Sequence, residues 1–513
     1  MLKQFIFPYL YRMGIIQRQG IKRSILTYIG VGIGAFSTLF IYPLELEVFG
    51  MMQFIVNTAS FFATFATFGV TVLPVRFFPV FENPQRAHNG FLGLLLAVAS
   101  AGLVVFWSIA WLFRSALYRF IAWIGFDVPL FEENMLFVLL ICAAMVFAAV
   151  LEAYTSNFKR VTVPSIFTNL FVKVSLPLGI FLLFNGIIGE YGLKWSLVWV
   201  FFAIVLALSL YLKYLGEWYV RLAPNFLTRP LVKEIASYAL FGILGSFGSV
   251  IAFRIDAIMV ASMTGTLNSG VYNIAYFIAN VIEVPFNAVI AIMGPLIASA
   301  LVRQQEGEVE DYYRKGSLNL MILGFLFYML AIICLDDLFR ITPRYEELIR
   351  GREVVWYLGF SKVLVMTFGI SSGILSLSKY YRLSLIPLLL LAGINVTLNF
   401  VLIPRYQMAG AAIATAISIL VFQSMNIFLV WRHLRINPFS RQMLLVLVLA
   451  LLVIFIGYWI PGTGFPLLNI VVKGMATAVL FIGPILYFRI SPDLNDFLLK
   501  NLAKAKAFLG KQT

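Results

Sequence analysis

The sequence predicts an all-α polytopic membrane protein, and three observations carry this prediction. The chain is 61% hydrophobic and 12% charged, with a mean hydropathy of +0.94, whereas soluble proteins carry roughly 25% charged residues. Apolar runs of about 20 residues, the length that a helix needs to cross a hydrocarbon core of about 30 Å, recur along the whole chain. Runs of that length favour helices over the shorter strands of a membrane barrel.

Breaks at charged or Pro- and Gly-bearing gaps divide the chain into fourteen predicted transmembrane helices. The first six are Ile25–Tyr42, Val48–Leu73, Phe91–Phe113, Met135–Val150, Val163–Phe184 and Trp195–Tyr211. The next six are Ile235–Ala261, Val271–Ala298, Leu318–Leu335, Val354–Leu377, Leu383–Ile403 and Gly410–Val430. A last pair runs over Met443–Ile460 and Leu467–Tyr487.

This grouping predicts two six-helix lobes and an extra helix pair. The predicted regions are an N-terminal arm (1–23), a first lobe (24–216), a second lobe (217–433), the extra pair (434–490) and a basic tail (491–513). The arm has basic residues around a short Phe-rich stretch and no small-residue cleavage site. We therefore expect it to lie on the cytoplasmic membrane surface rather than to be a removed signal peptide.

The basic residues predict the orientation. Most of the 38 Lys and Arg residues fall in loops on the same side as the N-terminus. Cytoplasmic loops carry such an excess, so we expect both termini in the cytoplasm and anionic lipid as a surface partner. The same spread over loops argues against nucleic-acid binding, despite a net charge of +15.

Cysteine and histidine give no sign of a metal site. Cys142 and Cys334 lie far apart in apolar runs, so no disulfide framework or thiolate site is predicted. His88 and His433 fall in short polar connections, where we expect solvated loop residues.

A faint internal repeat supports the two lobes. The first predicted helix carries Gly30, Gly32 and Gly34 and is followed by Phe49-Gly50, then Pro74. The seventh carries Gly242, Gly245 and Gly248 and is followed by Gly270-Val271-Tyr272, then Pro295. A repeated six-helix unit predicts two bundles with a transport cavity between them at the bilayer midplane, although Gly is also common in membrane helices.

Charged residues inside the predicted spans are the candidate functional groups, because each is costly in hydrocarbon unless it faces a cavity or a partner. They are Glu152, Lys173, Arg254, Asp256, Glu283, Lys362 and Lys473. Arg254 and Asp256 are two residues apart and do not share a helix face. We expect Arg254 to face the cavity and Asp256 a neighbouring helix, with the reverse assignment left open.

The buried cations suit a phosphate-bearing substrate. Arg254, Lys173 and Lys362 are the candidate substrate-binding residues, since fixed cations replace the hydration of a phosphate and Arg does so with a bidentate fork. Lys173 and Lys362 either line the cavity or pair with a carboxylate. Glu283 precedes Pro285 and forms a candidate polar, ion-coupling spot, whereas Glu152 and Lys473 lie near predicted helix ends and are expected to be structural.

The stretch from Asn395 to Ser418, which reads NVTLNFVLIPRYQMAGAAIATAIS, resembles a run found in polysaccharide flippases of the multidrug, oligosaccharidyl-lipid and polysaccharide exporter superfamily. Arg254-Ile-Asp256, Gly270-Val-Tyr272 and Phe49-Gly50 extend the resemblance, and Gln407-Met-Ala departs from it. The resemblance implies two lobes in a V that open alternately to each side of a bacterial inner membrane. Fourteen helices resemble the lipid-oligosaccharide and lipid II flippases, while multidrug extruders usually have twelve.

The resemblance also implies an ion site. Its ligands would be Asp256, Asn395, Asn399, the carbonyl of Ala411 and the hydroxyl of Thr415, all hard oxygen donors suited to Na⁺. Asn399 stands where the pattern can have a carboxylate. Hydrogen bonding between helices by the two Asn side chains is the alternative role. Both Na⁺ and H⁺ stay open as coupling ions, and no cofactor or other metal is expected.

The expected function is a flippase for an undecaprenyl-diphosphate-linked oligosaccharide, acting by alternating access and without catalysis. Other polysaccharide assembly proteins are possible partners. The alternatives are a cation-coupled multidrug exporter, whose cavity should be apolar and acidic, and a lipid II flippase. A membrane-embedded glycosyltransferase or polymerase is disfavoured, because the longest external stretch, Leu335 to Glu353, has acidic residues mixed with arginines and reads as a solvated, self-paired loop.

Overall fold

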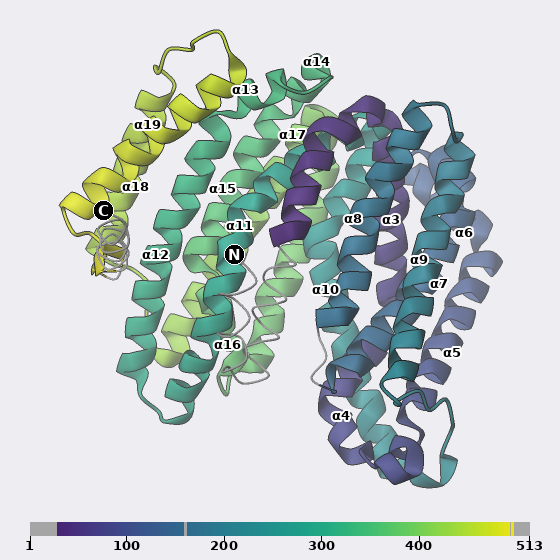
Figure 1. The fold of residues 1–513 in the computed structure, drawn as a ribbon. Coiled ribbons are helices and arrows are strands. Elements are labelled where there is room, and N and C mark those ends of the chain that lie inside the picture. The colour runs from purple at the N-terminus through teal and green to yellow at the C-terminus, as the bar shows by residue number, and fades with distance from the viewer. Residues whose placement is uncertain (1–27, 159–161, 493, 497–513) are drawn as a thin grey trace, which may run out of the picture. The chain divides into compact units, whose positions relative to one another are not determined.

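The part of the chain that the structure describes is predominantly helical, as the computed structural model shows (Figure 1). The described residues are 28–158, 162–492 and 494–496. No strand occurs among them, and the predicted all-α class is confirmed. The predicted arm at 1–23 lies outside the described residues, as does most of the predicted tail at 491–513.

Within the described residues, each predicted span coincides with helical structure. Residues 28–36 are helical and continue into a π-turn at Ser37–Ile41 and a 3₁₀ turn at Tyr42–Glu45. There follow α3 (Leu46–Ala66), α4 (Leu73–Phe81), α5 (Phe91–Leu112), α6 (Arg114–Trp123), α7 (Val128–Ser156), α8 (Thr162–Phe184), α9 (Glu190–Tyr214) and α10 (Arg229–Thr264). The later helices are α11 (Thr266–Val302), α12 (Glu306–Ile333), α13 (Leu335–Arg340), α14 (Tyr345–Leu348), α15 (Arg352–Phe368), α16 (Ile370–Leu377), α17 (Leu385–Leu434), α18 (Arg441–Gly457) and α19 (Pro466–Tyr487).

Nine of the described helical stretches are long and apolar enough to cross a membrane. The number rises to ten if Tyr345–Phe368 and Ile370–Leu377, which meet at a bend of 45°, are counted together as one span. The count of fourteen stays a prediction. α17 illustrates the difference: its 50 residues would extend about 75 Å at 1.5 Å per residue, far more than one bilayer. Its backbone breaks at Gln407 (φ 51°, ψ −132°), between the two spans predicted from the sequence.

The chain divides into two compact units. The first extends to Asn273 and takes in Asn399–Met408, and the second comprises Ile274–Leu398 and continues from Ala409. α11 and α17 therefore contribute to both units. The lobe boundaries predicted at residues 216 and 433 stay predictions.

In the first unit α7 packs against α3 and α9, and α3 packs against α10. Phe54 on α3 meets Phe131 on α7 edge to face, with ring centroids 4.9 Å apart. The two motifs that the repeat equates also meet here: a Cβ added at Gly50 would overlap the carbonyl oxygen of Thr266, and one added at Gly270 would overlap that of Leu46. Glycine at both positions therefore lets α3 and the start of α11 touch backbone to backbone.

In the second unit α12 packs against α15, α18 and α19. Met329, Val363 and Phe481 are fully or almost fully buried in this core. The C-terminal helix pair is thus joined to the unit by a continuous apolar layer.

Candidate functional site

Arg254 and Asp256 lie two residues apart on α10 and have opposite surroundings. Asp256 is only 2% exposed, and its carboxylate accepts hydrogen bonds from the Tyr272 hydroxyl at 2.6 Å and from the Ala257 backbone N–H at 2.8 Å. Arg254 is exposed. The carboxylate is therefore turned towards α11, as the spacing of the two residues predicts.

Arg254 is held by a neutral partner. Its Nη1 donates to the side-chain oxygen of Asn57 on α3 at 3.4 Å, and among the described residues it forms no ion pair with a carboxylate. Asn57 itself is buried. Within the described part of the chain, most of the five N–H donors of the guanidinium are therefore left for another ligand.

Lys173 is half-buried on α8 and, within the described part of the chain, likewise forms no ion pair. Its ammonium lies against Gly30, where an added Cβ would be 3.3 Å from Nζ. A larger residue at position 30 would therefore crowd the ammonium. On the same helix as Lys173, the hydroxyl of Thr168 donates to Glu152 on α7 at 3.4 Å.

Lys362 differs from these two cations because a carboxylate neutralises it. Its Nζ on α15 lies 2.7 Å from Oε2 of Glu283 on α11 and 5.7 Å from the centre of the Tyr276 ring. Lys362 is buried and Glu283 half-buried. Of the predicted site residues, these two are brought into direct contact, so Lys362 pairs with a carboxylate in this state.

The other predicted ion ligands are buried on α17. Asn395 and Asn399 lie before the break at Gln407, and Ala411 and Thr415 lie after it. Burial of two amides and a hydroxyl agrees both with ion binding and with hydrogen bonding between helices. The ion site stays a prediction. Within the described residues, no group of three or more His, Cys, Asp or Glu side chains is arranged to hold a metal ion.

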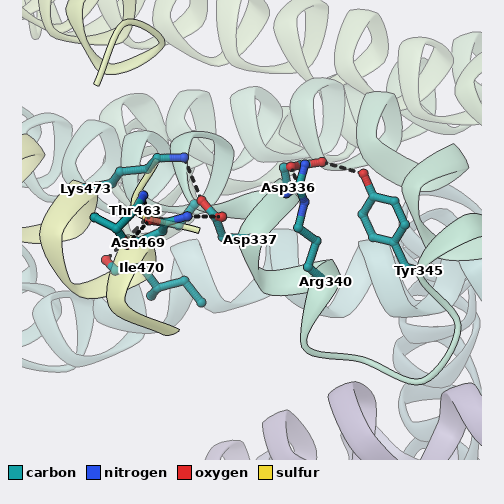
Figure 2. Close-up of polar contacts among 9 residues, drawn as sticks. Asp336, Asp337, Arg340, Tyr345, Thr463, Asn469, Ile470 and Lys473 are labelled. Atoms are coloured by element: carbon teal, nitrogen blue, oxygen red, sulfur yellow. Dashed lines mark hydrogen bonds and ion pairs between the residues drawn. The ribbon is translucent and has the colours of Figure 1, made fainter. Parts of the chain in front are cut away.

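A polar network that the sequence did not predict joins α13 to α19 (Figure 2). Asp337 accepts from Lys473 Nζ at 2.6 Å and from Asn469 Nδ2 at 2.8 Å. The Asn469 oxygen in turn accepts from the backbone N–H and the hydroxyl of Thr463 at 2.6 and 2.7 Å. Burial alone would raise the pKa of Asp337, but the hydrogen bonds from Lys473 and Asn469 outweigh it and the pKa lies below its ordinary value.

The neighbouring Asp336 behaves as a solvated, self-paired residue, as expected for this loop. It pairs with Arg340 at 2.9 Å and accepts from the Tyr345 hydroxyl at 2.8 Å. Asp337 is the exception because it faces α19, and no local spacing rule relates residues 136 positions apart.

The expectation that His88 is a solvated loop residue is wrong. The side chain is buried, and its Nε2 lies 2.8 Å from Glu217. Its Nδ1 accepts from the Asn83 backbone N–H at 3.2 Å, so Nε2 carries the proton that is donated to Glu217. The turn that inserts His88 has left-handed backbone at three consecutive non-glycine residues, Ala87 to Asn89. No periodicity in the sequence signals such a turn.

Comparison with known proteins gives one family. A family model described as "polysaccharide biosynthesis protein" matches residues 24–301. No curated protein matches the chain.

Several solved structures share the fold. The lipid II flippase MurJ in an inward closed conformation matches with a TM-score of 0.71 and 13% identity, over 92% of this chain and 100% of that chain. An inward-facing multidrug resistance MATE family transporter of the MOP superfamily matches with a TM-score of 0.61 and 12% identity, over 79% and 94%. A MOP superfamily transporter from Pyrococcus furiosus matches with a TM-score of 0.51 and 14% identity, over 83% and 97%. The chain therefore has the fold of these transporters.

Proposed function

This chain belongs to the polysaccharide biosynthesis protein family, and from that membership we propose that it moves a polyprenyl-diphosphate-linked oligosaccharide from the inner to the outer leaflet of a bacterial inner membrane. Both termini would face the cytoplasm, and the cycle would proceed by alternating access without catalysis. The transporter fold that it shares with MurJ supports this proposal.

The observation that carries the proposal is the exposed guanidinium of Arg254, held only by a neutral amide among the described residues. A diphosphate cannot cross hydrocarbon unaided, because moving its charge out of water costs tens of kcal/mol by Born estimates. A cation that is not already neutralised can replace part of the lost hydration with a bidentate charge-assisted hydrogen bond. Lys173 provides a second such cation in the same unit.

The same cations weigh against a cation-coupled multidrug exporter. A cationic drug would be repelled by Arg254 and Lys173, and a site for it should carry unpaired carboxylates instead. A lipid II flippase is a closer alternative, because lipid II also presents a diphosphate on a polyprenyl chain. Lipid II differs from other lipid-linked oligosaccharides in its glycan. The glycan on the precursor that accumulates in a transport-deficient strain therefore distinguishes these two functions.

Transport in cells tests the proposal. In a strain whose surface polysaccharide depends on this protein, Arg254→Ala should lower surface glycan at least tenfold, as expected for a lost hydrogen bond to a charged group, and the lipid-linked precursor should accumulate inside. Arg254→Lys should retain part of the transport. Lys315→Ala, which removes an exposed ion pair with Asp311, is the matched control. Unchanged surface glycan with altered drug tolerance would favour the exporter.

A further inference from the structure

A second candidate binding site lies within the first unit, and Arg254 is not among the residues that line it. A pocket of about 450 Å³ lies between α5, α6 and α7, with Phe62 of α3 contributing to its wall. Its volume falls within the range of about 300–1,000 Å³ typical of small-ligand sites. The lining is almost entirely apolar and aromatic and includes Phe106, Trp107, Ala110, Leu117, Met135 and Leu136.

One ion pair interrupts the apolar lining. Arg114 at the start of α6 and Glu132 on α7 lie 2.8 Å apart, with side chains 58% and 52% exposed. The Arg114 guanidinium also lies 5.4 Å from the centre of the Tyr118 ring. An exposed ion pair contributes little to stability. Its position beside an apolar pocket therefore indicates a ligand with an apolar body and charges of both signs.

The surrounding helices have the features of a membrane interface. α6 is a short helix that carries Arg114 and Arg119 together with Tyr118 and Phe120. Trp111, at the end of α5, and Trp123, the last residue of α6, are 76% and 81% exposed. Trp and Tyr concentrate at the level of lipid head groups, and short helices with basic and aromatic residues lie there. The amphipathic ligand that is abundant at the membrane interface is a phospholipid.

We propose that this pocket binds one zwitterionic phospholipid of the phosphatidylethanolamine type. The phosphate would accept hydrogen bonds from Arg114, whose planar fork suits it. The primary ammonium would donate to Glu132, and an acyl chain would fill the aromatic pocket. Arg114 and Glu132 place a positive and a negative charge side by side at the pocket. These charges complement the phosphate and the ammonium of a zwitterionic head group, whereas a purely anionic lipid has no group to pair with Glu132.

Native mass spectrometry of the purified full-length protein tests this, with phosphatidylethanolamine, phosphatidylglycerol and phosphatidylcholine of identical acyl chains as probes. Wild type should retain phosphatidylethanolamine about threefold more than either other lipid, a factor within the range that an exposed charge pair provides. Arg114→Gln should weaken its binding by a similar factor, and Glu132→Gln should abolish the preference over the other two. Ala110→Phe, which fills the pocket, should lower the retention of all three.

Arg119→Gln is the matched control. Arg119 lies on the same helix as Arg114, but its side chain donates to the backbone carbonyl of Ser115 and does not line the pocket. This variant should bind as wild type does. Equal retention of phosphatidylethanolamine and phosphatidylglycerol by wild type would overturn the charge complementarity, and equal retention of phosphatidylcholine would overturn the hydrogen bond to Glu132. Wild-type retention by both Arg114→Gln and Glu132→Gln would overturn the site itself. Transport of the lipid-linked glycan is a separate measurement, so this proposal can fail while the proposed function stands.

Discussion

At the scale of single residues, the chain neutralises some intramembrane cations and leaves others available. Lys362 pairs with Glu283 and Lys473 with Asp337, at 2.7 and 2.6 Å. Arg254 instead contacts the amide of Asn57. Within the described residues this guanidinium has no carboxylate partner, and because an unneutralised charge in hydrocarbon is costly, we expect the working protein to require that charge.

The buried Asp337 gives a prediction about stability and pH. Asp337→Asn should destabilise the protein by about 2–3 kcal/mol at neutral pH, because it leaves Lys473 without its carboxylate. The folded-state pKa of Asp337 lies below its unfolded value, so the stabilisation is complete above about pH 4 and is lost as the pH falls through the folded-state pKa. Thermal unfolding in detergent between pH 3 and 8 measures the difference between wild type and variant.

Asp336→Asn is the matched control for this measurement. Asp336 is the adjacent residue, but its pair with Arg340 is largely exposed, so its loss should cost about 1 kcal/mol or less. Equal destabilisation by the two variants at neutral pH, or a gap between wild type and Asp337→Asn that did not narrow as the pH fell below about 4, would contradict the assigned role of Asp337.

At the scale of helices, the backbone contact between α3 and α11 is the feature least tolerant of change. Gly50→Ala or Gly270→Ala should each destabilise the protein by about 2 kcal/mol or more, because the added methyl group overlaps a carbonyl oxygen of the facing helix. Gly32→Ala is the control, since a Cβ there meets nothing within 4 Å. Apparent melting temperatures in detergent measure the effect. Similar values for Gly32→Ala and Gly50→Ala would show that the contact is unimportant.

Helices were predicted well because their signal is local. A run of apolar residues of bilayer length reports a span without reference to the rest of the chain, and each predicted run coincides with helical structure. The details that failed depend on backbone geometry that composition does not encode. The left-handed turn at Ala87 to Asn89, which buries His88, is such a detail, whereas the break of α17 at Gln407 falls in the gap between two predicted spans.

At the scale of the whole molecule, the sequence could not predict which charged residues form ion pairs with residues that are distant in sequence. The spacing of Arg254 and Asp256 correctly separated their surroundings, because two residues on one helix obey a fixed geometry. Lys362 and Glu283 are 79 residues apart, and Asp337 and Lys473 are 136 apart. Such pairs are determined by tertiary packing, so the sequence identified the charged residues without identifying their partners.

The source of energy for transport is also a property of the whole molecule, and Asp256 is the residue at which we expect it to act. A carboxylate that is 2% exposed in a membrane span is costly unless a hydrogen-bond donor, a cation or a proton offsets its charge, so Asp256, which accepts from the Tyr272 hydroxyl, is the group that we expect a coupling ion to meet. In proteoliposomes with an imposed Na⁺ or H⁺ gradient, Asp256→Asn should reduce the gradient-driven rate of lipid-linked glycan transport roughly tenfold, within the range typical of coupling between sites.

Asp256→Asn keeps the size of the side chain and an oxygen that can accept from Tyr272, so a loss of coupling would report the charge rather than the fold. Tyr272→Phe is the companion variant, because it removes the hydroxyl donor and leaves the carboxylate in place. It should keep coupling to the same ion, since the charge that the ion must meet is unchanged. Whichever of the two gradients, Na⁺ or H⁺, accelerates transport by the wild-type protein identifies the coupling ion. If either gradient still accelerated Asp256→Asn as strongly as wild type, the coupling carboxylate would have to be sought elsewhere, with Glu283 beside Lys362 as the next candidate.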